Sequence, residues 1–188
     1  MTKRDHIVRT TIHLCGSQGL GDVPTARIAK EAGVATGTLF HHFSTKADLI
    51  KAAYITVHED YVWNMIRYFD VPATSLKKGL KKGITGAINY WSRNPLYFEF
   101  TRQVRHSHYF DSDLRNRLKQ IQLSLHTILV QAVDSGILRK MDHGLMIDQI
   151  FASIDAGASR IIRADQSAAV RKLKRDTVSY IWRAVVRS

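Results

Sequence analysis

The side chains between residues 25 and 46 have types and spacing suited to contact with nucleic acid. Cationic, hydroxyl and imidazole groups recur there, at Thr25, Arg27, Thr36, Thr38, His41, His42 and Lys46. Cations bind phosphate, whereas hydroxyl and imidazole groups can hydrogen-bond base edges and threonine methyls can contact thymine. Gly37 and Phe40 lie among these residues. A glycine there would let backbone and duplex approach closely. These residue types favour contact with double-stranded DNA.

Two short helices joined by a glycine turn are expected to position these groups. Apolar residues mark one face of the first helix, at Ile28, Ala29 and Ala32. Gly33 follows, where a helix end often needs a left-handed residue. The second helix begins near Thr36, with Leu39 and Phe43 four residues apart on its buried side. This pattern predicts a helix-turn-helix, whose second helix enters the major groove. A three-helix bundle without a DNA function is the alternative.

The segments Ile28–Val34 and Gly37–Phe43, followed by Lys46 and Leu49, closely resemble the N-terminal signature of TetR-type (TetR/AcrR) transcriptional regulators. The resemblance keeps the family spacing over about fifty residues. It implies an all-helical, ligand-responsive homodimer that usually represses transcription. It does not imply which ligand is bound.

The resemblance also implies roles for individual residues. Lys46 matches a lysine that contacts phosphate, and His41 falls at a position used for DNA contact. His42 matches a common histidine that either contacts DNA or braces the helix. Phe40 stands where the family usually has a phosphate-contacting tyrosine, so its ring can pack but offers no hydroxyl. Thr25 is either a backbone contact or a plain helix N-cap.

Helical spacing of apolar residues continues to the C-terminus, and no alternating strand pattern occurs. Helices are expected near residues 3–18, 25–32, 36–43, 45–69, 72–94, 96–106, 112–135, 142–164 and 167–187. Prolines stand where three of them should begin, at Pro24, Pro72 and Pro95. The sequence therefore predicts an all-α fold of about nine helices. Residues 1–50 form a DNA-binding head that continues into the long helix 45–69, and residues 51–188 form an effector-binding and dimerisation bundle.

Charge and composition support a DNA-binding protein without proving it. The 188-residue chain has a net charge of +12, which favours polyanionic partners. Residues 1–50 nevertheless hold only six Lys/Arg against four Asp/Glu. The lone Cys15 excludes an intrachain disulfide and is expected to be a buried thiol. No apolar run approaches the roughly 18 residues of a membrane span, so we expect a cytoplasmic protein without a membrane partner.

Aromatic residues are concentrated between residues 61 and 110, which is compatible with a cavity for an apolar or aromatic effector. The expected lining residues are Trp63, Tyr90, Trp91, Phe98 and His126. Ordinary core packing is the alternative. Two C-terminal apolar stripes predict a homodimer interface at Ile150, Ile154, Gly157, Ala158, Ile161, Tyr180, Ile181 and Ala184. These stripes could instead face inward.

Other polar clusters suggest weaker alternatives. His106 and His108, with Asp111, have the residue types of a metal or enzyme site. Histidines two apart point away from each other on a helix, and no interpretable nucleophile–base pair occurs. We therefore expect no metal, no cofactor and no enzyme. Two basic faces are either solvated or bind an anionic effector: Lys77, Lys78, Lys81 and Lys82, and Arg171, Lys172, Lys174 and Arg175. A ligand-independent DNA-binding regulator also remains open.

Overall fold

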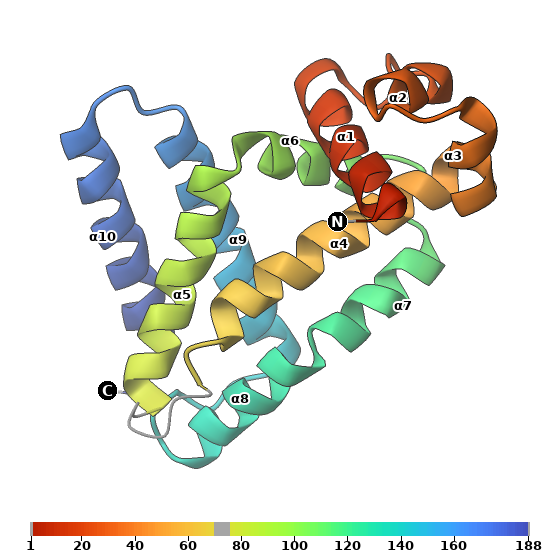
Figure 1. Cartoon of the computed structure of the whole chain (residues 1–188). Helices are drawn as coiled ribbons and strands as arrows, with labels where there is room; N and C mark the ends of the chain where they lie inside the picture. Colours follow the sequence, from red (N-terminus) through yellow and green to blue (C-terminus); the bar gives the residue numbers. More distant parts are fainter. Residues whose placement is uncertain (1, 70–75, 188) are drawn as a thin grey trace. The chain divides into compact units, whose positions relative to one another are not determined.

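The computed structural model describes residues 2–69 and 76–187, and within them it contains ten helices (Figure 1). They are α1 (Lys3–Gln18), α2 (Thr25–Glu31), α3 (Thr36–His42), α4 (Lys46–Ile66), α5 (Leu76–Arg93), α6 (Pro95–Arg105), α7 (Ser112–Ile121), α8 (Leu123–Asp134), α9 (His143–Ile162) and α10 (Ser167–Val185). The all-α prediction is confirmed. Pro72, expected to begin a helix, lies outside the described residues.

The predicted helix 112–135 is two helices, which accounts for ten helices instead of about nine. The break falls at Gln122, which precedes α8 with φ −82° and ψ −5°. Leu114, Leu118 and Leu125 are all buried on either side of it. Because the apolar spacing of three or four residues continues across Gln122, the sequence pattern gives no sign of the interruption.

The chain divides into two compact units. The first contains residues 1–60 and 94–120, and the second contains residues 61–93 and 121–188. Helix α4 therefore contributes residues to both units. This division describes packing, whereas the division near residue 50 was a functional one and stays a prediction. None of the described helices is long and apolar enough to cross a membrane.

In the first unit, α1 packs closely against α6. A Cβ atom at Gly16 would collide with the backbone carbonyl of Leu96, so the two helices approach through a position that only glycine can fill. Gln103 on α6 adds polar contacts. Its Oε1 accepts from the Leu20 backbone N–H (3.0 Å), and its Nε2 donates to the Cys15 carbonyl (3.3 Å). Helix α6 is therefore part of the same folded unit as the N-terminal helices.

Two buried groups on α1 and α4 have shifted proton affinities. Burial raises the pKa of the Cys15 thiol to about 11, so the thiol is neutral and a poor nucleophile near neutral pH. His58 is buried on α4, where its ring stacks on Tyr54 at 4.2 Å and its Nδ1 lies 3.0 Å from the Tyr54 carbonyl oxygen. Burial, assisted by the charge of Arg105, lowers the pKa of His58 to about 4.

In the second unit, α5, α9 and α10 pack together, and α8 packs on α9 (Figure 1). The last turns of α4 lie against a row of glycines on α5. A Cβ at Gly83 would come 2.7 Å from the Met65 carbonyl oxygen, and one at Gly86 would collide with the Asn64 carbonyl. We call Gly79, Gly83 and Gly86 the glycine seam. It allows two helix backbones to approach where larger residues would hold them apart.

Candidate nucleic-acid interface

The turn between α2 and α3 has the conformation that the sequence predicts. Gly33 has φ 63°, a left-handed value that glycine adopts at little cost. The Gly33 N–H donates to the Lys30 carbonyl (3.1 Å), and the Val34 N–H donates to the Ala29 carbonyl (3.0 Å). These bonds satisfy carbonyls at the end of α2 and reverse the chain into α3. The two short helices pack against each other and against α1.

Helix α3 buries one face and exposes the other. Leu39 is fully buried and Phe43, just after the helix, is nearly so. Of the predicted contact residues, Thr36, Gly37, Phe40, His41 and His42 are exposed, and Thr38 is half-buried. Phe40 exposes 43% of its surface, so its ring is open to contact from outside the chain. These residues are brought together on one short helix; their contact with DNA stays a prediction.

Gly37 and Lys46 border the exposed face of α3 in different ways. No atom lies within 4 Å of a Cβ added at Gly37, so packing within the protein does not require glycine there. Lys46, the first residue of α4, donates from Nζ to the Leu20 carbonyl (2.7 Å). An ammonium group has three N–H donors, so Lys46 can hold this loop and still bind a phosphate.

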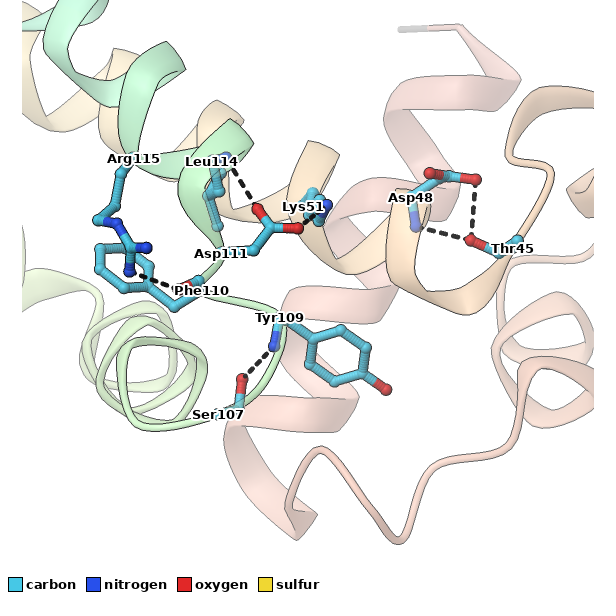
Figure 2. Close-up of polar contacts among 9 residues, drawn as sticks. All are labelled: Thr45, Asp48, Lys51, Ser107, Tyr109, Phe110, Asp111, Leu114 and Arg115. Carbon is cyan, nitrogen blue, oxygen red and sulfur yellow. Dashed lines mark hydrogen bonds and ion pairs between the residues drawn. The ribbon is translucent and has the colours of Figure 1, made fainter.

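Thr45 caps the start of α4 (Figure 2). The Asp48 N–H donates to Thr45 Oγ1 (3.1 Å), and the hydroxyl donates to the Asp48 carboxylate (2.8 Å). At α2, in contrast, Pro24 occupies the N-cap position and Thr25 is the first helical residue. The N-cap alternative for Thr25 is therefore wrong. Thr25 is half-buried and Arg27 is exposed.

A polar contact that sequence reasoning missed joins α4 to the start of α7. Lys51 forms an ion pair with Asp111, whose other oxygen accepts from the Leu114 N–H at 3.0 Å (Figure 2). These two interactions hold the pKa of Asp111 below its usual value. Phe110 packs edge-on against Tyr54 (5.7 Å), and Arg115 donates to the Phe110 carbonyl (3.0 Å). Asp111 thus caps the start of α7.

The residues considered for a metal or enzyme site have different surroundings. His106 and His108 are exposed, and Asp111 is engaged as described. Among residues 2–69 and 76–187, no group of three or more His, Cys, Asp or Glu side chains is placed to hold a metal ion.

The predicted effector residues are scattered. Trp91 is buried and stacks on Tyr61 at 4.5 Å, with Tyr90 edge-on beside it, which is core packing. Trp63 exposes 53% of its surface and His126 is exposed. Phe98 is half-buried on α6, in the first unit. Their role in effector binding stays a prediction.

The second unit also contains an apolar cavity that these residues do not line. Its lining consists of Met65, Phe69, Leu80, Gly83, Ile84, Leu125, Leu129, Leu138, Ile147, Ile150, Phe151, Trp182 and Val185. Sequence reasoning missed it because aliphatic residues at helical spacing look the same whether they fill a core or border a cavity.

Most of the residues predicted for a dimer interface face inward. Buried side chains within the second unit are Ile150, Ile154, Ala158, Ile161 and Ile181. A side chain enclosed by its own subunit cannot also contact another, so for these five the inward alternative describes the structure. Gly157 packs against the Thr177 side chain of the same chain, whereas Tyr180 and Ala184 are exposed.

Comparison with known proteins finds similarity along the whole chain. The family model for "Bacterial regulatory proteins, tetR family" matches residues 7–53. The nucleoid occlusion factor SlmA of Vibrio cholerae is 24% identical over 173 residues, covering 88% of this chain and 86% of the relative. A crystal structure of a proposed tetR family transcription regulator from Shewanella sp. PV-4 has a TM-score of 0.87 at 25% identity, with both chains fully covered. A TetR family regulator from Marinobacter aquaeolei VT8 has a TM-score of 0.85 at 19% identity, covering 99% of this chain and 96% of that one.

Proposed function

Because the chain belongs to the tetR family of DNA-binding transcriptional regulators, we propose that it is a homodimeric repressor that leaves a palindromic operator when a small molecule binds. The observation that carries this proposal is the exposed face of α3 beside Lys46. Leu39 and Phe43 hold the helix to its unit, and the residues between and before them are left for a duplex. A helix of this kind reads base edges in the major groove while flanking cations hold phosphates.

We predict separate roles for Lys46 and His41. Lys46→Ala should weaken binding similarly for all operator variants and lower the slope of log affinity against log salt by about one, because one phosphate contact is lost. His41→Ala should instead change the preference at particular base pairs. Both effects are measurable by titrating variant operators at several salt concentrations.

Lys119→Ala on α7 is the matched control, since Lys119 is exposed and remote in sequence from the motif. Lys46→Ala also removes the hydrogen bond to the Leu20 carbonyl. The thermal unfolding midpoint of this variant must therefore be measured, so that a loss of stability is not mistaken for a loss of phosphate contact. Identical effects of Lys46→Ala and His41→Ala on every operator would contradict the two roles.

For the dimer, we propose the outward face of α9 and α10 as the contact with a second copy. A groove there is lined by Ala152, Ser153, Ala156, Gly157, Arg160, Asp176, Thr177 and Tyr180. Small residues permit the close approach of another helix, and Tyr180, with 66% of its surface exposed, can supply buried area. A face that contacts the same face of its copy gives the two-fold symmetry that a palindromic operator matches.

Ala156→Arg should produce folded monomers, because a long charged side chain would enter this helix packing. Sedimentation velocity checks the oligomeric state, and circular dichroism checks the fold. Ser124→Arg, which adds the same charge at an exposed position of α8, should leave the dimer intact. If the Ala156→Arg protein sediments as a dimer, the contact lies elsewhere.

Release by an effector requires that the small molecule bind more tightly to the conformation that does not bind DNA. The apolar cavity of the second unit supports an effector with an apolar part. By thermodynamic linkage, operator DNA must weaken effector binding by the same factor by which the effector weakens DNA binding. If a small molecule binds this cavity without changing the affinity of the protein for its operator, the ligand-independent regulator is favoured instead.

A further inference from the structure

Trp182 on α10 borders two different spaces of the second unit. One is the apolar cavity, and the other is a surface groove of about 720 Å³ between α5 and α10. We call the second space the basic groove; it is lined by Lys81, Thr85, Lys174, Arg175, Asp176, Val178, Ser179, Trp182 and Arg183. A single indole ring therefore separates an apolar compartment from a cationic one.

The basic groove holds more positive charge than its own residues neutralise. Lys81 Nζ lies 4.7 Å from the centre of the Trp182 ring and Lys77 Nζ lies 5.8 Å from it. Within the part of the chain that the structure describes, Arg175 and Arg183 form no ion pair. The one carboxylate of the lining, Asp176, is already paired with Lys172 at 2.8 Å.

Lys174 is the most buried of these cations and makes its hydrogen bond to a neutral group instead of a carboxylate. Its Nζ donates to Asn89 Oδ1 (2.9 Å), a neutral acceptor. Partial burial, reinforced by repulsion from Arg93, lowers the pKa of Lys174. An anion in the groove would favour the charged ammonium of Lys174 and accept charge-assisted hydrogen bonds. Thr85 and Ser179 add hydroxyl groups to the same lining.

The apolar cavity has the opposite chemistry and is narrow. Its walls include Leu80, Ile84 and Val185 as well as Trp182. The space open inside it is about 20 Å³, close to the volume that one water-sized sphere occupies. An apolar chain must therefore widen the cavity by moving side chains. A ligand that binds only a widened conformation releases DNA when that conformation binds DNA less tightly than the narrow one.

We propose that the effector is an anionic amphiphile, with its apolar chain in the widened cavity and a phosphate-type headgroup in the basic groove, on either side of Trp182. The proposed binding site stands by itself, and only the statement that this ligand is the effector rests on the proposed function. A doubly charged phosphate fits the groove better than a carboxylate, because several cations and two hydroxyls surround the site. The two headgroups share the chemistry of an anion, and the experiment separates them.

Calorimetric titration of the full-length chain tests the proposal, with each probe kept below its micelle concentration. Dodecyl phosphate should bind about tenfold more tightly than dodecanoate, and dodecyltrimethylammonium should not bind. Across hexyl, octyl, decyl and dodecyl phosphate, affinity should rise about fourfold for each added methylene, because each is buried. A flat chain-length series, or equal binding of the trimethylammonium probe, would overturn the proposal.

The double variant Lys174→Gln/Arg175→Gln should bind dodecyl phosphate at least about tenfold more weakly. The increase of affinity with alkyl chain length should be preserved. Arg117→Gln/Lys119→Gln on α7 removes the same charge from exposed positions and should bind the probe as the unmodified chain does. Equal loss in both double variants would show that only overall charge matters and would overturn the site.

The operator assay separates this proposal from the proposed function. Dodecyl phosphate that binds with the expected dependence and releases operator DNA supports both. Binding without release supports the amphiphile site and contradicts its role as effector site. Operator binding that another compound reverses, with no dodecyl phosphate bound, overturns the amphiphile site and leaves the repressor proposal standing.

Discussion

Gly86→Ala should lower the free energy of unfolding of the second unit by about 3 kcal/mol, because the added methyl group meets backbone that cannot move independently. In the glycine seam, a Cβ at this position would collide with the Asn64 carbonyl of α4. The loss outweighs the gain of about 1 kcal/mol that alanine normally brings to a helix. Tryptophan fluorescence reports this unfolding selectively, since Trp63, Trp91 and Trp182 all lie in the second unit.

Two other glycines calibrate the effect. Gly37→Ala should be neutral or stabilising, because no atom lies within 4 Å of the added carbon. Gly79→Ala should lower the free energy of unfolding less than Gly86→Ala does. Its added carbon meets the Phe69 side-chain ring, which can rotate away, and not backbone. Urea denaturation of the three variants, followed by circular dichroism because it reports the helices of both units, gives the comparison. Equal stability of Gly86→Ala and Gly37→Ala would show that α4 and α5 do not need the glycine seam.

Acid should destabilise the first unit through His58. The pKa of this histidine is about 4 when folded and 6.5 when exposed by unfolding, so the unfolded chain binds the proton first as the pH falls. The stabilisation is complete above pH 6.5 and is lost progressively down to pH 4. Its size is about 3 kcal/mol, from a difference of about 2.5 pKa units.

His58→Gln is the comparison that isolates this effect. The variant should be less stable at pH 7, since it loses the stacking on Tyr54, but its stability should fall less between pH 6.5 and 4. All carboxylates are common to both proteins, so their contribution to acid denaturation cancels in the difference. Parallel pH profiles of the two proteins would contradict a neutral, buried His58.

The sequence predicted the elements of the first unit well because their signals are local. Helix α1 was expected over residues 3–18 and is found at Lys3–Gln18. Gly33 adopts the left-handed φ that its place after a helix implied. The Lys51–Asp111 ion pair joins residues 60 positions apart, and no local pattern marks such a contact.

The second unit was harder to predict because one pattern serves several purposes. The stripe that includes Ile150 and Ile154 has the spacing of a helix face, but spacing does not say whether that face meets the same chain or another. The glycine seam was also missed, since glycine carries no apolar signal. Its function becomes visible only when the α4 backbone is placed against it.

The packing of α1 on α6 limits how the DNA-binding part can be exchanged between regulators. A chain cut after the helix-turn-helix would lack α6, whose Leu96 backbone packs against Gly16 of α1. It would also lack Gln103 of α6, which accepts a hydrogen bond from the loop at Leu20. Lys46 donates a hydrogen bond to that same loop, so the residue proposed to bind phosphate would lose its support as well. The transplantable module is therefore discontinuous in sequence, and a chimera that keeps the DNA specificity of this chain must carry α6 with the first three helices.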